Sequence, residues 1–325
     1  MESTAARSGR SIDEAVSVLG RRLFLCSVFA AGLVLLDPAL LRAGNAAVTR
    51  GLIVDDPFAA WSQSSDTQVV LLGDCRPAIL DTPFLSREMG KRVLNLGASM
   101  SGLGHILFGS QLLRSRGGYD VVVFLNDDIM ATDEQRVVPE MALEWIWSPY
   151  LPSENRKRLE SDFPQGLGHS GLWRFRGKGT LLARAALHAL KGTRPVAHES
   201  EPIAFFGDAS MVGREKDYTP NPRLPTDYAL GHLDRALSDL AATVPVTLVL
   251  SPMHYLRATP EARERFVQEA KSLARRHGLE LVNHFDNQAE WAHRSDWWGD
   301  TGHLNRKGLA AYMPTLARDL REALQ

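Results

Sequence analysis

The 325-residue chain contains four short polar clusters whose side chains are of the types that carry out nucleophilic and proton-transfer chemistry. They supply a thiol, an imidazole, carboxylates and a primary amide. The clusters are Gly73-Asp74-Cys75-Arg76, Gly97-Ala98-Ser99-Met100-Ser101-Gly102, Asn126-Asp127-Asp128 and Asp300-Thr301-Gly302-His303-Leu304-Asn305. The first three each follow an apolar run. In open α/β sheets ligands bind beyond the carboxyl ends of the strands, so a site is expected at these positions.

The elements that must position these clusters are visible in the hydrophobic pattern. Continuous apolar runs are typical of strands that are buried on both faces. Such runs occupy residues 67–72, 92–96, 119–125, 244–250 and 279–282. Helical patterns lie at residues 106–114, 228–243, 260–277 and 304–324. Strands that alternate with helices predict an α/β fold with a parallel sheet covered on both faces.

Residues 132–205 interrupt this alternation. They contain helical patterns at 138–147 and 180–191 around a charged, glycine-rich stretch. We interpret them as a helical insertion in a main domain that spans residues 67–325. Residues 47–66 are interpreted as a linker that leads into this domain.

Residues 1–46 have the order of an export segment. The uncharged residues 23–36 follow Arg21 and Arg22. As a helix they would reach roughly 21 Å, which is short of the ~30 Å hydrocarbon core of a bilayer. A cleaved signal peptide and an uncleaved membrane anchor are both consistent with this pattern, and either would place the rest of the chain outside the cytoplasm. A buried core helix is the third interpretation.

The composition excludes several classes of protein. With 37 basic and 38 acidic residues the chain has no basic surplus, so nucleic-acid binding is not expected. A hydrophobic content of 44% argues against a disordered chain. The two cysteines, Cys26 and Cys75, cannot build a disulfide scaffold or a multi-thiolate metal site. Because neither metal-ligand spacing nor a nucleotide-binding motif is present, no metal or cofactor is expected.

The order of the four clusters resembles the SGNH (GDSL-type) hydrolase superfamily over about residues 67–325. The resemblance implies a three-layer α/β/α, flavodoxin-like fold. It also implies a nucleophile at position 75, with His303 as base and Asp300 as the group that orients it. Gly102 and Asn126 would contribute to the oxyanion hole, with Gly97 as the competitor of Gly102. The family has Gly where this chain has Phe124.

The spacing of Asp300 and His303 is compatible with this role. A turn that enters a helix can present both side chains to one site, where the carboxylate holds the tautomer of the imidazole. The alternative is that Asp300 caps the helix and His303 is solvated. For Asn126 the alternative is a turn residue, and for both glycines it is a simple turn position.

Cys75 is the main departure from the family, which has Ser at this position. A thiol is a capable nucleophile once a histidine lowers its pKa or accepts its proton. It would form a thioester with the acyl group of the substrate. The second interpretation is a catalytically silent relative that retains the fold. The third is a buried, inert cysteine.

Arg76 narrows the resemblance to a membrane-anchored subgroup that modifies cell-envelope polymers. This subgroup includes alginate O-acetyltransferase-like proteins and the D-alanylation protein of teichoic acid synthesis. The resemblance implies acyl transfer or ester hydrolysis on an exported polysaccharide or related polymer, with a membrane-bound acyltransferase as a partner. Arg76 and Trp298 are candidate substrate-binding residues. The alternatives are a surface or capping arginine and a core tryptophan.

The sequence therefore predicts an extracytoplasmic acyltransferase or esterase with a Cys75–His303–Asp300 triad. The alternative from a different class is an inactive binding protein or scaffold in a polymer modification or export complex.

Overall fold

A computed structural model of the chain describes residues 64–98, 102–137, 151–162, 186–191, 207–285 and 289–325, with isolated residues 40, 42, 58, 60, 61 and 193. Within these residues a single sheet has five strands in the order β2-β1-β3-β4-β5. The strands are β1 (Val69–Leu72), β2 (Val93–Asn95), β3 (Asp120–Leu125), β4 (Val246–Leu250) and β5 (Glu280–Asn283). All four pairings are parallel. The predicted parallel α/β sheet is confirmed.

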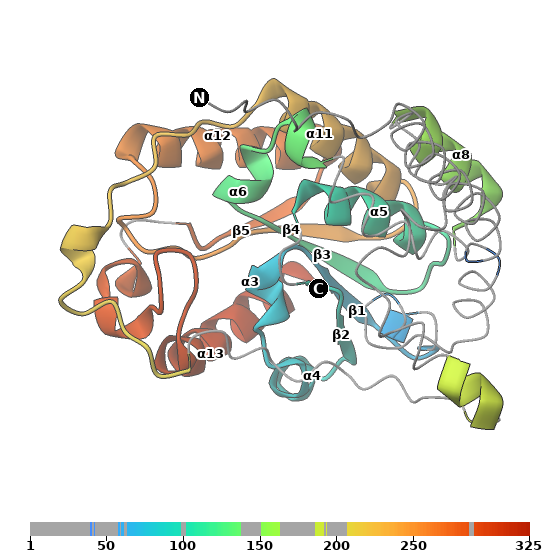
Figure 1. Cartoon of the computed structure of the whole chain (residues 1–325), viewed down its shortest axis with the longest axis horizontal. Coiled ribbons are helices and arrows are strands. Elements are labelled where there is room, and N and C mark those ends of the chain that lie inside the picture. Colours follow the sequence, from blue (N-terminus) through green and yellow to red (C-terminus); the bar gives the residue numbers. More distant parts are fainter. Residues whose placement is uncertain are drawn as a thin grey trace, which may run out of the picture.

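Helices cover both faces of this sheet (Figure 1). On one face lie α5 (Leu103–Leu113), α11 (Asp227–Ala241) and α12 (Pro260–His277). On the other lie α4 (Thr82–Met89) and α13 (Arg306–Ala323). The short helices α3 (Cys75–Ala78) and α6 (Asp127–Met130) follow β1 and β3 directly. The remaining described elements are α8 (Ser153–Asp162), η2 (Glu215–Asp217), η3 (Glu290–His293) and η4 (Ser295–Trp297).

The strands form where the sequence supplies unbroken apolar runs. Every residue of β1, β2 and β4 is buried, as is β3 after its first residue. Burial on both faces is expected for β1, β3 and β4, which lie in the interior of the parallel sheet, and the edge strand β2 is buried as well. By contrast, Glu280 at the start of the edge strand β5 is exposed. The register places β1 beside β3, so the loops that follow these strands begin next to each other.

Local signals set the ends of the helices. In α12 the Thr259 side chain accepts a hydrogen bond from the amide of Ala262, Pro260 occupies the first turn, and Gly278 ends the helix at φ 63°. A left-handed residue at this point favours glycine, which has no Cβ. The helix α4, which the hydrophobic pattern did not predict, is capped by Asp81 and ended by Gly90 at φ 65°.

The insertion and the N-terminal segment are described only in part. The predicted helix at 138–147 and nearly all of residues 1–46 lie outside the described residues. Within the insertion, α8 is a helix that the sequence pattern did not predict, and it packs near α5 (Figure 1). In the part of the chain that the structure describes, none of the helices combines the length and the apolar character needed to cross a membrane.

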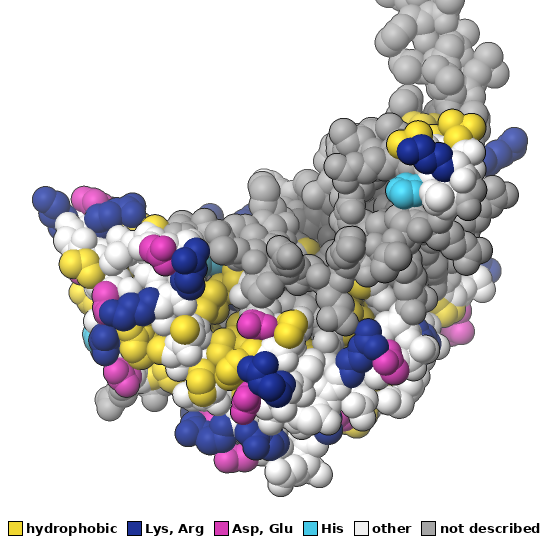
Figure 2. Space-filling model, turned by 90° about the horizontal axis from the view of Figure 1, so that it is seen from below, with side chains coloured by type: hydrophobic (Ala, Val, Ile, Leu, Met, Phe, Trp, Pro, Cys, Tyr) yellow, Lys and Arg dark blue, Asp and Glu magenta, His cyan; other side chains and the backbone are white. Residues whose placement is uncertain are grey.

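The described surface carries charges of both signs. Figure 2 shows the face seen from below Figure 1, where Lys and Arg alternate with Asp and Glu and hydrophobic side chains lie among them. This mixture agrees with the near-zero net charge of the sequence. The described part of that face therefore provides no broad basic surface of the kind that nucleic acids need.

Candidate active site

The Cys75 thiol lies at the carboxyl edge of the sheet, on the first residue of α3. Gly73 makes the tight approach after β1 possible. A Cβ at this position would lie 2.8 Å from Cγ of Pro77 and 2.9 Å from Cβ of Phe124. Asp74 caps α3 by accepting the amide of Arg76 at 2.9 Å. The thiol is partly buried and free of any disulfide.

His303 and Asp300 lie beside this thiol. The Sγ atom of Cys75 is 2.9 Å from Nε2 of His303. On the other side of the imidazole, Nδ1 of His303 is 3.0 Å from Oδ1 and 3.1 Å from Oδ2 of Asp300. The structure therefore brings together the three residues of the predicted triad, in the order thiol, imidazole, carboxylate.

The loop that carries Asp300 and His303 is held by the start of α13. Asn305 caps this helix through the amide of Gly308, and its Nδ2 donates to the carbonyl oxygen of Asp296 at 2.9 Å. Asp300 accepts a hydrogen bond from the backbone amide of His303 at 2.8 Å and another from the imidazole ring of the same residue. Asp300 is therefore not the cap of α13, which was the alternative reading of this carboxylate.

The protonation of Asp300 fixes the roles of the two imidazole nitrogens. Burial opposes ionisation of this carboxyl, but hydrogen bonds from His303 and from the amide of Gly302 outweigh it and lower the pKa of Asp300. An ionised carboxylate only accepts hydrogen bonds, so Nδ1 of His303 must be the donor. In the neutral imidazole, Nε2 is then the nitrogen that accepts the proton of the Cys75 thiol.

The surroundings of the Cys75 thiol favour its protonated form. Burial, together with the carboxylates of Asp74 and Asp128, raises the pKa of Cys75 to about 12, and Arg76 opposes this shift. A preformed thiolate–imidazolium pair is therefore not favoured. The geometry instead suits proton transfer to His303 as Sγ attacks, which is general-base catalysis.

The structure places Asn126 in contact with Asp74, the residue before Cys75. Its side chain is fully buried, with Nδ2 donating to Oδ2 of Asp74 at 2.6 Å and Oδ1 accepting the amide of Ile129 at 3.0 Å. It caps α6 and supports Asp74, which is the role of a structural turn residue. An oxyanion contact by Asn126 stays a prediction.

The two glycine candidates are in different environments. Gly102 is buried at the start of α5, next to residues 99–101, which are not described. The amide of Gly97 donates to Oδ1 of Asn95 at 2.8 Å. Because that amide is already occupied, Gly102 remains the better candidate for an oxyanion amide, and its role stays a prediction.

Arg76 is placed differently from the expectation of a substrate ligand. Its side chain is 4% exposed and donates to Asp74 at 2.7 Å and to Asp127 at 3.0 Å. A third bond reaches Asp128 at 3.3 Å. The guanidinium is therefore occupied by carboxylates of its own chain, and Arg76 holds the site together rather than facing a substrate.

Trp298, the other candidate substrate-binding residue, lies in the core. Its side chain is completely buried. The indole N–H donates to the carbonyl oxygen of Trp291 at 2.6 Å, and the ring packs against His254. Trp298 is a core residue that supports the loop before Asp300, and it has no open face for a sugar ring.

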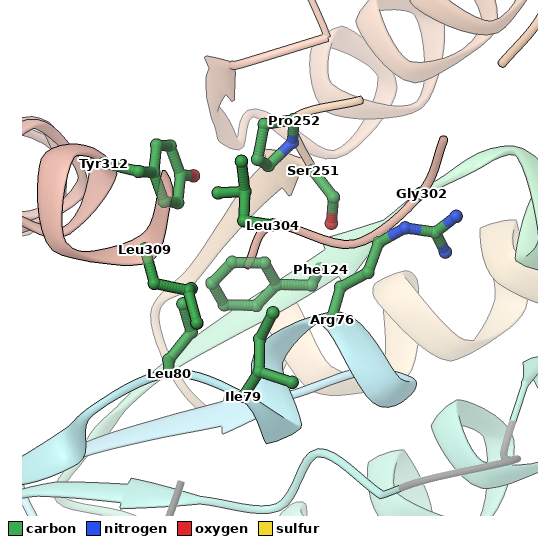
Figure 3. Close-up of a pocket in the computed structure, with 10 residues that line it drawn as sticks. All are labelled: Arg76, Ile79, Leu80, Phe124, Ser251, Pro252, Gly302, Leu304, Leu309 and Tyr312. Atoms are coloured by element: carbon green, nitrogen blue, oxygen red, sulfur yellow. The ribbon is translucent and has the colours of Figure 1, made fainter. Parts of the chain in front are cut away.

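A small cavity lies between the segment of α3 that includes Arg76 and the helix α13 (Figure 3). Its volume is about 20 Å³, which is room for about one water molecule. Apolar side chains such as Phe124 and Leu309 line it, and the guanidinium of Arg76 points away from it. It is too small for an acyl chain or a sugar ring.

Sequence reasoning missed Arg257, which lies in the loop after β4. Its Nε donates to Asp127 at 2.7 Å and its Nη2 to Asp128 at 2.5 Å. The rule that directed attention to the carboxyl ends of the strands applies here too.

No protein-family model matches this chain, and no curated protein sequence matches it significantly. Among the described residues, no group of three or more histidine, cysteine, aspartate or glutamate side chains is arranged to hold a metal ion. The described structure shows a parallel five-stranded α/β domain that is consistent with an SGNH-like fold.

Proposed function

We propose that this chain is an SGNH-type enzyme that transfers or hydrolyses acyl esters through Cys75. The observation that carries the proposal is the chain of contacts from Sγ of Cys75 to Nε2 of His303 and from Nδ1 of His303 to Asp300. The sheet order 2-1-3-4-5 supports it, because flavodoxin-like sheets have this order.

The proposed reaction has two steps. In the first, Sγ of Cys75 attacks the acyl carbon while His303 accepts the thiol proton. The alcohol leaves with that proton, and a thioester remains on Cys75. In the second, a hydroxyl group of an acceptor or of water loses its proton to His303 and attacks the thioester. The C–S bond breaks, the new ester or free acid is released, and His303 returns the proton to Sγ, which restores the thiol.

The substrate that we propose is an acyl ester of a cell-envelope polysaccharide or a related polymer. Its support is the resemblance carried by Arg76 and the order of the four clusters, together with the apolar residues 23–36 behind a pair of arginines. On the same grounds we propose an extracytoplasmic location and a membrane-bound acyltransferase as partner.

A second candidate, a silent binding protein with the same fold, is favoured by two observations. The thiol is a weak acid, with its pKa raised to about 12 by burial and by Asp74 and Asp128. In addition, the side-chain amide of Asn126 donates a hydrogen bond to Asp74 and does not bond to the thiol. The raised pKa disfavours the thiolate, and the bond to Asp74 occupies the donor that Asn126 would offer to an oxyanion.

The test is the intact mass of the purified full chain after incubation with p-nitrophenyl acetate. We expect an acetyl adduct or turnover that disappears in Cys75→Ala and in His303→Ala. The control is Cys75→Ser: if it gains activity, the chain is a disabled serine enzyme. If the parent protein forms no adduct and folded Cys75 resists iodoacetamide, the silent protein is the correct interpretation.

A further inference from the structure

Five charged residues, two of which flank Cys75 in the sequence, form a cluster of ion pairs. We call it the Cys75 ion cluster. Its members are Asp74, Arg76, Asp127, Asp128 and Arg257. They come from the segments after β1, β3 and β4, which are neighbours in the sheet. The cluster therefore joins three loops at the edge where the candidate active site lies.

Arg257 completes this cluster from outside the nucleophile segment. Each of the carboxylates Asp127 and Asp128 bonds to both Arg76 and Arg257. Arg76 in turn lies next to Cys75 in α3. Arg257 is thus connected to the thiol-bearing helix through two bridging carboxylates, although it touches neither Sγ nor the imidazole ring in any hydrogen bond that the structure shows.

Burial makes the balance of charges important. Asp74, Arg76 and Asp127 have side chains that are no more than 4% exposed. Asp128 is 41% and Arg257 22% exposed, so they form the outer part of the cluster. Loss of one partner from a buried ion pair leaves an uncompensated charge, which costs more than the pair itself contributes.

The turn that contains Arg257 also contacts the other half of the site. The amide of Arg257 donates to the carbonyl oxygen of His254 at 2.9 Å and closes the turn. The amide of His254 donates to the carbonyl oxygen of Thr301 at 3.1 Å, one residue after Asp300. The turn at residues 254–257 is therefore connected to the Cys75 segment through the Cys75 ion cluster, and to the His303 segment through Thr301.

We infer that Arg257 is a positioning residue for the Cys75–His303 pair, and that it balances the charge of Asp128 beside the thiol. The inference deepens the proposed function and rests on it for any effect on acyl transfer. Its effect on the thiol itself is independent of that function. The other titratable or charged groups around Sγ are His303, Asp74 and Arg76, and the positive charge of Arg136 lowers the pKa of Asp128.

The test is the rate at which iodoacetamide alkylates Cys75 in the full chain between about pH 6 and pH 10, since only the thiolate reacts. Peptide masses count Cys75 separately from Cys26. In Arg257→Gln the charge of Asp128 is unbalanced, so we expect alkylation to slow by about threefold to tenfold, which corresponds to a rise of up to about one pKa unit. In Asp128→Asn we expect a comparable acceleration.

The double variant Arg257→Gln/Asp128→Asn separates charge balance from mere loss of structure. We expect it to react faster than Arg257→Gln and close to the parental rate, because the charge of Asp128 is gone and Asp127 keeps its bond to Arg76. A double variant as slow as Arg257→Gln would overturn the inference, as would an unchanged rate in Arg257→Gln. The matched control Arg306→Gln removes an arginine that is 69% exposed and paired with Asp208, and should leave the rate unchanged.

If Arg257→Gln does not fold, Asp128→Asn alone decides the question: a rate that fails to rise overturns the inference. Failure of the proposed function has a different signature, which is the absence of an acyl adduct in the parent protein. Alkylation that follows the predicted order without any acyl adduct would retain the positioning role and reject the enzyme.

Discussion

Nε2 of His303 lies 2.9 Å from Sγ of Cys75, although 228 positions separate the two residues in the chain. The contact exists because β1 and the loop before α13 meet at one edge of the sheet. Gly302, the residue before His303, packs against Arg76, the residue after Cys75. A Cβ on Gly302 would lie 3.2 Å from Nη2 of Arg76. The two halves of the site are therefore in contact through the neighbours of both residues.

Asp300→Asn should show how much the reaction depends on the tautomer of His303, because the imidazole itself is retained. The amide of Asn can donate to Nδ1, which would leave the ring proton on Nε2 and prevent it from accepting the thiol proton. We expect acyl-adduct formation to fall by about 100-fold or more. The measurement is the initial rate of adduct formation by mass spectrometry. Asp208→Asn is the control, since Asp208 is 78% exposed, and equal rates in both variants would contradict the role of Asp300.

Arg76→Met should destabilise the protein strongly. It removes the shared partner of Asp74 and Asp127, whose side chains are 3% and 4% exposed. Breaking a buried ion pair from one side costs about 3–5 kcal/mol. We expect this loss in the free energy of unfolding measured by urea titration. Arg306→Met, at an exposed ion pair, should show no measurable change, and a similarly small change in Arg76→Met would mean that the cluster is not structurally important.

The fold was predictable where burial and pattern agree. The strands lie within two residues of the apolar runs, because a central parallel strand needs apolar side chains on both faces. The helix α8 was missed because only Asn155 and Leu159 are buried in it, which gives no apolar stripe. The helix α4 was missed because its evidence lies in its caps, Asp81 and Gly90, rather than in a long periodic pattern.

The triad residues of the site could be predicted from the sequence, but the contacts that bury Arg76 and Trp298 could not. Cys75, Asp300 and His303 could be grouped because each lies at an expected position in the order of elements. The burial of Arg76 and Trp298 depends on carboxylates and backbone groups brought in by tertiary structure. Sequence spacing carries no information on such partners, so it leaves both a substrate-binding and a structural role open for the two residues. Arg257 was missed for the same reason.

Gly97→Ala should displace the helix that carries the thiol. An added Cβ would lie 2.6 Å from the amide nitrogen of Ala78 and 2.8 Å from Cγ of Pro77, so α3 would have to move. Overpacking of this kind costs about 1–3 kcal/mol. We expect that loss in urea unfolding, together with slower acyl-adduct formation.

The matched control for this variant is Gly117→Ala. A Cβ on Gly117 meets nothing within 4 Å, and Gly117 is not among the glycines with positive φ. Its stability and adduct rate should stay at the parental values. If both alanine variants behave alike, the close packing of the loop after β2 against α3 does not set the position of Cys75.

His254 should make the protein less stable as the pH falls from about 6.5 to about 4. Burial is the main cause that lowers the pKa of His254 from 6.5 to about 4, and Glu215 opposes it. Because the folded-state pKa lies below the unfolded value, the unfolded chain binds more protons in this window. Stability is therefore complete above the unfolded pKa and decreases with falling pH, by up to about 1.4 kcal/mol per pH unit for one group.

The measurement is the free energy of unfolding in urea at a series of pH values, compared between the parent and His254→Asn. The Asn oxygen can still accept the amide of Leu256, which bonds to Nδ1 of His254 at 3.3 Å. The variant has no group that titrates here, so its stability should depend less steeply on pH between about 6.5 and 4. Burial also lowers the pKa of His284, which keeps a residual slope in both proteins. Parallel curves for parent and variant would show that His254 is not a source of the acid sensitivity.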